Sequence, residues 1–375
     1  MTALSLRLPL LRVREGWALV AAAWIVSRVL TLAAFAVLRA LGPLGYLGRR
    51  FYRTPLGLLS TWDGVWYRRI VDYGYVFVPG RQSDVAFFPG YPLVVKALTA
   101  TGLGFSVVGP LASNVLLLVA LVAFYELSCR MFDRDFAGRA AVFAALAPAG
   151  FVYSMSYPSS LLFACVALAC LAALADAWGL AAVFAAFAGL TRPEAIVVVV
   201  PLAFLAWSRR KWLGPRRFGC ALAAAAAAPV AIASYPAYLK WAVGDGHAWS
   251  TAEVAWGRSF RLDGPWLALR KLPHALAEHP GYAGDLMLLA AYAVLLVAAR
   301  RAGTSWPWIA GGLLVLVVPL FSGTIESEGR FGLVALPVYW GLAASTRSPR
   351  AGGAARLVSG ALLVAGVLTL PFIWP

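Results

Sequence analysis

The sequence predicts an all-α protein that crosses a membrane many times. Of its 375 residues, 62% are hydrophobic and 13% are charged, and the mean hydropathy is +0.78. A soluble domain carries roughly 25% charged residues. Apolar runs of about 20 residues, the length that spans a bilayer as a helix, recur along the chain. These runs are rich in Ala and Leu and lack the alternating pattern of strands, so we expect helices rather than a barrel.

The apolar segments occupy nearly the whole chain, and we expect a single integral membrane domain over residues 1–375. The first segment follows Arg7, Arg12 and Arg14 and is longer than the core of a signal peptide, so we expect it to be retained as the first helix. In order, the segments are 16–40, 86–104, 107–129, 138–154, 158–176, 179–191, 193–208, 217–243, 283–301, 305–321, 329–345 and 354–373.

Basic loops predict the orientation of the chain. The positive-inside rule places all of them, and the N-terminus, on the cytoplasmic side. This parity requires segment 86–104 to enter the membrane and return, and its start, Pro89-Gly90-Tyr91-Pro92, suits a bend. We therefore expect eleven full crossings in a fold of about 11–12 membrane helices, with two large extracytoplasmic loops, 41–85 and 244–282. The basic loops are 1–15, 130–139, 208–217, 300–304 and 346–356.

The net charge of +16 does not indicate nucleic-acid binding. The arginines are scattered over short loops between helices, where a multi-pass protein needs them for orientation, and no segment resembles a nucleic-acid module. We expect no nucleic-acid partner.

The first extracytoplasmic loop carries an amphipathic helix over residues 62–73, predicted to lie on the membrane surface. Its apolar face consists of Trp62, Val65, Trp66, Ile70 and Tyr73. Aromatic residues are common at the water–lipid boundary, which by itself explains the tryptophans. The same loop also holds arginines on the side that usually avoids them, at positions 49, 50, 53, 68, 69 and 81. They favour a bound phosphate, with Arg68 and Arg69 among its ligands, over a surface that merely contacts anionic lipids.

Asp63 is the candidate general base. It is the only carboxylate between Glu15 and Asp72, and a solitary carboxylate among aromatic side chains at an interface suits that role. Asp72 and Asp84 are competitors, which we expect to pair with arginines of the same loop.

Two further polar segments interrupt the apolar sequence on the same side. Arg192-Pro193-Glu194 lies between two apolar segments, and charges in such a position usually face an interior cavity. Arg192 is either a phosphate ligand oriented by Glu194 or half of a structural ion pair. Arg330, which follows Glu326 and Glu328, is a second candidate phosphate ligand. The hydroxyl-rich turn 153–160 suits either a sugar or hydrogen bonds between helices.

No metal or disulfide is predicted. The cysteines at 129, 165, 170 and 220 lie in or beside apolar segments, without the spacing of metal ligands. His247, His274 and His279 match no metal motif, and we expect no cofactor.

Together these residues resemble the PIG-V family of mannosyltransferases, in its bacterial branch. The markers keep the family's order over about residues 20–340, and the block from Trp62 to Pro92 is the most specific. One departure is the position after Tyr153-Ser154, where the family often carries Glu and this chain has Met155. The matching residues are Trp62-Asp63, Gly74-Tyr75, Ala86-Phe87-Phe88-Pro89-Gly90-Tyr91-Pro92, Asn114-Val115, Tyr153-Ser154, Gly189-Leu190-Thr191-Arg192-Pro193-Glu194, Arg330-Phe331, Pro337 and Tyr339-Trp340.

The resemblance implies a glycosyltransferase of the GT-C type, a multi-helix membrane enzyme whose active site faces away from the cytoplasm. It implies a polyprenyl-phosphate sugar donor, with mannose as the expected hexose, and a lipid-linked or cell-envelope acceptor. Asp63 would act as the base and Arg192 and Arg330 would stabilise the phosphate leaving group. One carboxylate suffices for an inverting single displacement, whereas glycoside hydrolysis generally uses two. The expected substrate-binding residues are Trp62, Trp66, Tyr67, Tyr91, Tyr157 and Glu194.

Two readings from other classes remain. A transporter or flippase for a lipid-linked saccharide would share the arginines and the multi-pass body, and it predicts inverted repeats and broken helices at the middle of the membrane. A membrane scaffold would leave the loop around Asp63 unexplained.

Overall fold

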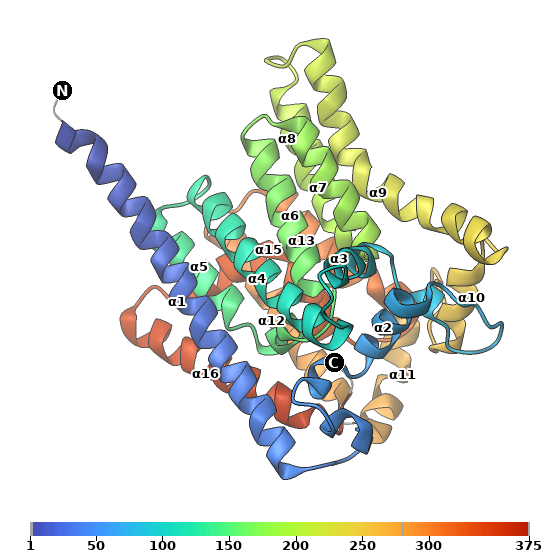
Figure 1. Ribbon diagram of the computed structural model, residues 1–375. Coiled ribbons are helices and arrows are strands. Elements are labelled where there is room, and N and C mark those ends of the chain that lie inside the picture. Colours follow the sequence, from blue (N-terminus) through green and yellow to red (C-terminus); the bar gives the residue numbers. More distant parts are fainter. Residues whose placement is uncertain (1–2, 280, 374–375) are drawn as a thin grey trace.

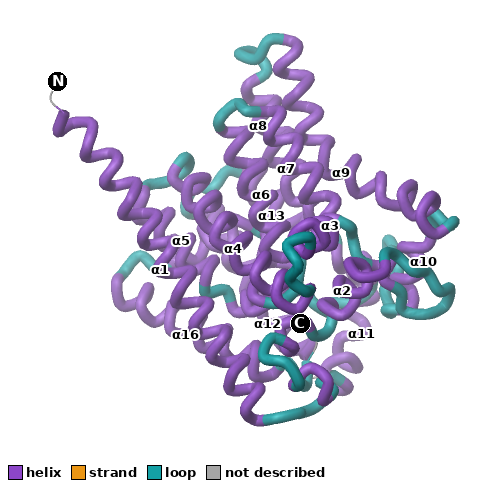
Figure 2. The backbone as a smooth tube through the Cα atoms, viewed as in Figure 1, coloured by secondary structure: helices purple, strands orange, loops and turns teal. Residues whose placement is uncertain are grey.

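The computed structural model describes residues 3–279 and 281–373, and this part of the chain consists of helices and short connections, without a strand (Figure 2). The all-α prediction is therefore confirmed. The α-helices are α1 (Ala3–Leu41), α2 (Asp63–Tyr73), α3 (Gly90–Thr99), α4 (Phe105–Cys129), α5 (Arg134–Ala145), α6 (Ser159–Leu174), α7 (Trp178–Thr191), α8 (Val199–Arg209), α9 (Pro215–Val243), α10 (Ala248–Ala255), α11 (Gly264–Glu278), α12 (Gly281–Arg301), α13 (Trp306–Val317), α14 (Glu328–Phe331), α15 (Leu336–Ser345) and α16 (Pro349–Thr369).

Short 3₁₀-helices lie between several of these helices or extend them. They are η1 (Arg49–Tyr52), η2 (Gly57–Ser60), η3 (Asp84–Ala86), η4 (Pro148–Ser154), η5 (Pro193–Val198), η6 (Pro319–Ser322) and η7 (Gly332–Val334). Several begin with proline, which has no backbone N–H to continue the preceding α-helix.

Helix lengths identify a multi-pass membrane protein. Among the described residues, five helices are long and apolar enough to cross a bilayer: Glu15–Leu41 within α1, and α4, α9, α12 and α16. A sixth arises if α5 and η4, which meet at a bend of 71°, form one broken span. The remaining apolar helices, including α6 and α7, are shorter than the roughly 20 residues that a span requires. The number of eleven crossings therefore stays a prediction.

Segment 86–104 does not form one long helix. Its helical part, α3, has ten residues, which is about 15 Å at 1.5 Å per residue. That is half of the roughly 30 Å hydrocarbon core. Pro89 stands immediately before the helix as its N-cap, where the sequence predicted a bend. Helix α3 alone is too short to cross, and it packs on α2, α4 and α7.

The long helices pack side by side around a common core. Helix α1 lies against α16 and α5, and α7 lies along α9 (Figure 1). The second contact is close because small residues line it: a Cβ added at Gly189 would stand 2.5 Å from the carbonyl oxygen of Ala228. Small residues allow such approach between membrane helices. This packing fixes the end of α7, from which the Arg192 segment begins.

Helix α2 forms at the position of the predicted amphipathic helix, but its buried residues are only partly those of the predicted apolar face. The structure buries Gly64, Tyr67, Ile70 and Val71, whereas Tyr73, placed on the apolar face by the sequence, is 81% exposed. Ile70 of the predicted apolar face is thus buried together with Tyr67 from its border and with Gly64 and Val71, because α2 packs on α3 and η2.

Candidate functional site

Asp63 is the first residue of α2 and follows a backbone of unusual conformation. The N-cap residue Trp62 has φ 53° and ψ −122°, a left-handed region that residues with a Cβ seldom occupy and that costs on the order of 1–3 kcal/mol. The backbone N–H of Asp63 donates to the hydroxyl of Tyr157 at 3.1 Å. The carboxylate therefore stands at the positive end of a helix, at a position that the surrounding structure fixes.

Arg330 forms an ion pair with Asp63 across 267 residues of sequence. Nη1 of the guanidinium donates to Oδ2 of the carboxylate, and the two side chains are only 7% and 17% exposed. The guanidinium also lies 5.6 Å from the ring centroid of Tyr157. Its Nε is buried and has no hydrogen-bond partner among the described residues, so one donor of Arg330 is uncommitted.

Helix α12 positions the loop that carries Arg330. The two carboxylate oxygens of Asp285 accept hydrogen bonds from the backbone N–H groups of Ser327 and Gly329, each at 2.9 Å, and the hydroxyl of Tyr292 donates to the carbonyl of Gly329 at 2.7 Å. Ser327 has φ 70°, and a Cβ at Gly329 would stand 2.6 Å from a methyl group of Leu288. The loop is thus held against α12 in a strained and tightly packed form.

Arg192 and Glu194 form the second ion pair of the site. Nε and Nη2 of Arg192 donate to the two oxygens of Glu194 at 3.0 and 2.9 Å, a bidentate arrangement of the strong kind. Their side chains are 14% and 8% exposed. Arg192 caps the end of α7 and Pro193 begins η5. Arg192 is therefore half of an ion pair and, at the same time, the candidate phosphate ligand.

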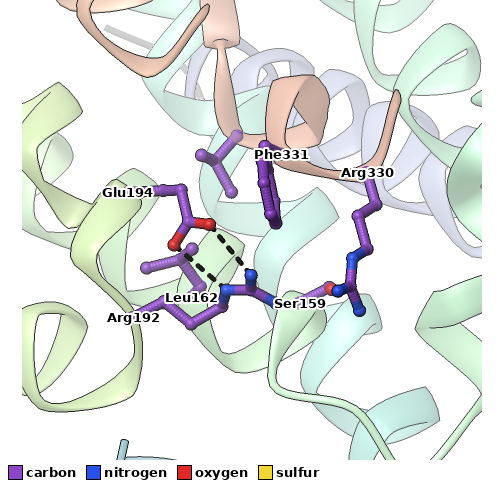
Figure 3. Close-up of a pocket in the computed structure, with 7 residues that line it drawn as sticks. Ser159, Leu162, Arg192, Glu194, Arg330 and Phe331 are labelled. Atoms are coloured by element: carbon purple, nitrogen blue, oxygen red, sulfur yellow. Dashed lines mark hydrogen bonds and ion pairs between the residues drawn. The ribbon is translucent and has the colours of Figure 1, made fainter. Parts of the chain in front are cut away.

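One cavity joins the two arginines. It is lined by Ser159, Leu162, Arg192, Glu194, Arg330, Phe331 and Val334 (Figure 3), and the ring of Phe331 lies 4.9 Å from the guanidinium of Arg192 and 5.4 Å from that of Arg330. Its volume is about 10 Å³, close to the minimum that holds one water molecule. The cavity is small in this conformation, and each of its arginines is paired with a carboxylate. We refer to it below as the arginine cavity.

Tyr67 lies in electrostatic contact with both ion pairs. It is buried on α2, and its ring packs edge-on against Phe87 at 5.2 Å and Tyr91 at 5.3 Å. Burial raises the pKa of its phenol, while the charge of Arg192 opposes that shift. Tyr67 is therefore a neutral hydrogen-bonding group at physiological pH.

Arg68 and Arg69 do not lie at the arginine cavity, contrary to the expectation that they bind the donor phosphate with Arg192 and Arg330. Arg68 pairs with Asp72 at 3.3 Å and Arg69 with Asp84 at 3.8 Å, as expected for the two competing carboxylates. Both arginine side chains are about half exposed. The i,i+4 spacing of Arg68 and Asp72 was the signal for this outcome.

The aromatic residues predicted to bind substrate have different surroundings. Tyr157 lies at the ion pair of Asp63. Trp66 packs against Phe87 at 6.0 Å and Trp256 at 5.5 Å. Tyr91 is fully buried, and its hydroxyl hydrogen-bonds to the carbonyl of Gly109 and to Ser113, each at 3.0 Å. The contacts of Tyr91 are those of a residue that joins α3 to α4.

Glu328 is a buried carboxyl that sequence reasoning did not single out as functional. It is fully buried, and neither oxygen has a hydrogen-bond partner among the described residues. Burial, with smaller contributions from the charges of Asp285 and Glu194, raises the pKa of Glu328 to about 9. It is therefore a neutral acid at pH 7, two residues from Arg330. Within the described ranges, no three His, Cys, Asp or Glu side chains are grouped as a metal site.

Comparison with known proteins supports the family resemblance. The profile of the family described as mannosyltransferase (PIG-V) matches residues 29–209, a range that includes Asp63, Tyr157 and Arg192. The predicted resemblance is confirmed over this range. No curated protein sequence matches the chain.

Among solved structures, the chain is similar to ArnT from Cupriavidus metallidurans, bound to undecaprenyl phosphate, at 17% identity and a TM-score of 0.49, over 89% of this chain and 62% of that one. It is similar to the Archaeoglobus fulgidus oligosaccharyltransferase tethered to an acceptor peptide, at 13% identity, a TM-score of 0.42, and coverage of 94% and 54%. It is also similar to AglB from the same organism, in complex with an inhibitory peptide and a dolichol-phosphate. The identity is 12% and the TM-score 0.45, over 94% of this chain and 55% of that one. The chain thus spans only about half to three-fifths of the length of these proteins.

Proposed function

We propose that this PIG-V-type glycosyltransferase transfers a hexose, with mannose as the expected sugar, from a polyprenyl-phosphate donor to a lipid-linked or cell-envelope acceptor on the extracytoplasmic side of the membrane. The observation that carries the proposal is the meeting of Asp63 with Arg330 and Arg192. Asp63 pairs with Arg330, and the largely buried guanidinium groups of Arg330 and Arg192 line a single cavity.

The arginines suit a phosphate leaving group. A polyprenyl-phosphate sugar is a phosphodiester with one negative charge, whereas the released monoester carries about −1.5 to −2 at pH 7. The attraction of Arg192 and Arg330 for the phosphate therefore grows as the bond from the anomeric carbon to the phosphate oxygen breaks. An interaction that strengthens along the reaction lowers the barrier.

Asp63 suits the general base. In the proposed step, the acceptor hydroxyl oxygen bonds to the anomeric carbon, and its proton passes to the Asp63 carboxylate. The bond between the anomeric carbon and the phosphate oxygen breaks, and its electron pair leaves with the polyprenyl phosphate. This single displacement inverts the anomeric centre and needs no second catalytic acid, because the phosphate leaves without protonation.

The two ion pairs imply an exchange of partners when the donor binds. Arg330 is paired with Asp63, and Arg192 with Glu194. To bind the donor phosphate, each guanidinium must therefore redirect at least one of its N–H groups from the carboxylate to the phosphate. The uncommitted Nε of Arg330 gives that exchange a starting point. Once Arg330 binds phosphate, the Asp63 carboxylate is free to accept a proton. The donor is therefore expected to bind before the acceptor.

The test compares two substitutions on the same helix. Purified protein in liposomes receives polyprenyl-phosphate [¹⁴C]mannose and a membrane-lipid extract as acceptor, and transfer of label is followed. Asp63→Asn should reduce transfer by about 10²–10⁴-fold, the usual contribution of a general base, while Asp72→Asn, in an exposed pair, should remain close to wild type. Transfer at the wild-type rate in Asp63→Asn would refute the base. Translocation of the carrier without transfer would favour a flippase.

A further inference from the structure

A second cavity lies between α11, the start of α12 and the loop before α14. Its volume is about 150 Å³, and its polar lining includes Trp256, Lys271, Tyr282, Thr324 and Glu326. None of these residues was assigned to the site around Asp63. We refer to it as the α11 cavity.

We propose that the α11 cavity binds a neutral sugar ring of the acceptor, an inference that rests on the proposed function. The acceptor would thus be a glycan or glycolipid, not a bare lipid alcohol or a peptide. Its ring would occupy the α11 cavity while the phosphate of the donor occupies the arginine cavity.

The lining has the chemistry that a sugar requires. Glu326 accepts hydrogen bonds and Lys271 donates them, and the hydroxyls of Tyr282 and Thr324, 3.3 Å apart, can do either. The buried indole N–H of Trp256 has no hydrogen-bond partner among the described residues. Apolar walls from Ala268, Leu272 and Ala275 complete the cavity and suit the C–H faces of a pyranose ring.

Other ligand classes fit this lining less well. A lipid tail would desolvate the charges of Glu326 and Lys271, which is costly. A phosphate would meet the Glu326 carboxylate, whose nearest guanidinium, Arg258, already lies at 3.9 Å from it. The volume of about 150 Å³ is below the roughly 300–1,000 Å³ of pockets for drug-sized ligands, so the cavity suits one ring better than an extended chain.

Two lines of packing connect the α11 cavity to the proposed reaction centre. On one side, the ring of Trp256 lies edge-on to Trp66 at 5.5 Å and to Phe87 at 5.8 Å. Trp66 belongs to α2, which begins at Asp63. The wall of the cavity is thus in contact with the helix that carries the proposed base.

On the other side, Arg258 connects Glu326 to the arginines. Its Nη2 donates to the carbonyl of Glu326 at 3.3 Å, and its guanidinium lies 5.6 Å from the ring of Phe331. That ring lines the arginine cavity and lies against Arg192 and Arg330. A sugar in the α11 cavity would therefore lie beside the donor site, as an acceptor must.

The test fills the cavity from one side of α11. Ala275 lines the cavity, whereas Ala277 is exposed on the same helix, so Ala275→Leu adds volume inside and Ala277→Leu is the matched control. Full-length protein in lipid nanodiscs, without glycoside detergents, is titrated with methyl α-D-mannopyranoside and methyl β-D-glucopyranoside by saturation-transfer NMR. We expect wild type and Ala277→Leu to bind at least one of these glycosides, and Ala275→Leu to bind it at least tenfold more weakly.

A second variant, at Trp256, controls for a folding defect. Trp256→Phe keeps an aromatic ring against Trp66 and Phe87 but removes the indole N–H, and it should weaken glycoside binding severalfold. Binding of polyprenyl phosphate should be unchanged in all three variants, which also reports that they are folded. Equal glycoside affinity in Ala275→Leu and Ala277→Leu, or no glycoside binding by wild type, would overturn the proposal.

The glycoside-binding test and the test of the proposed function can fail independently. If Asp63→Asn abolishes transfer but the glycosides do not bind, the catalytic proposal stands and the assignment of the α11 cavity fails. If the glycosides bind at the α11 cavity but transfer does not depend on Asp63, the cavity assignment stands as a sugar site and the proposed mechanism fails.

Discussion

Arg330 holds the carboxylate of Asp63 in an ion pair that is almost entirely shielded from water, with the two side chains 7% and 17% exposed. The same guanidinium lines the cavity that contains Arg192. The side chain of Arg330 therefore contacts the proposed base and also lines the proposed phosphate site. Four predictions follow from this arrangement and from the residues around it.

The first prediction concerns the stability of the Asp63–Arg330 pair. Removing one partner leaves the other charge buried and unpaired, so Asp63→Asn and Arg330→Gln should each lower the free energy of unfolding by about 3–5 kcal/mol. The double variant should cost clearly less than the sum of the two, because neither charge is then left alone. Thermal and denaturant unfolding of the four proteins in the same detergent measures this. Strictly additive costs would mean that the pair is not formed.

The second prediction concerns Asp285, which we expect to be a positioning residue for Arg330. Asp285→Asn keeps the size of the side chain but replaces one acceptor oxygen with a donor, so it cannot accept both N–H groups of Ser327 and Gly329. A misplacement of about 1 Å costs on the order of 10²-fold in rate. The KM for the polyprenyl-phosphate donor should rise at least tenfold.

A purely structural role for Asp285 would not separate the two substrates. The KM for the acceptor should therefore stay within twofold of wild type in Asp285→Asn. Asp263→Asn, which disturbs an exposed ion pair with Arg261, should change neither constant. Equal increases of both KM values in Asp285→Asn would point to a general loss of structure and not to positioning of Arg330.

The third prediction separates the arginines that the sequence grouped together. Arg192→Gln should reduce transfer by 100-fold or more, because it removes a buried charge next to the phosphate and leaves Glu194 unpaired. Arg68→Gln should change donor KM by less than threefold, and the change should fade at high salt because an exposed charge is screened. Initial rates at two ionic strengths test both. A large, salt-independent loss in Arg68→Gln would restore the sequence-based assignment.

Sequence patterns predicted the helices and several residues of the site, but not their pairing. The apolar runs were sufficient for the helices because lipid permits little else, and isolated charges between them drew attention to Asp63, Arg192 and Arg330. The ion pair of Asp63 and Arg330 was not predicted, because a separation of 267 residues is closed only by packing of the whole chain.

Other features were missed although a signal was present. Asp285 is a single carboxylate near the start of an apolar helix, a position that usually has a partner. The 62–73 helix was assigned its apolar face from periodicity alone, but α2 packs on α3 as well as facing outward, so Tyr67 is buried and Tyr73 is exposed. Periodicity identifies a helix, but it does not tell which side packs on the protein and which side faces outward.

The fourth prediction concerns Glu328 and the pH dependence of stability. Its pKa is raised by burial from the ordinary value of 4.5 to about 9 in the folded protein. Between these two pH values the folded state retains a proton that the unfolded state has released. The contribution of Glu328 to stability is therefore greatest below pH about 4.5 and falls by about 1.4 kcal/mol per pH unit until the folded carboxyl ionises.

Glu328→Gln removes this dependence because an amide does not ionise over that range. We expect the unfolding temperature of Glu328→Gln to exceed that of wild type by an amount that grows steadily between pH 5 and pH 8. Glu15→Gln, an exposed position on α1, is the matched control and should follow the wild-type curve. Parallel curves for wild type and Glu328→Gln would show that the Glu328 carboxyl is ionised in the folded protein, which requires a cationic partner or bound water within the cluster around Asp285 and Arg258.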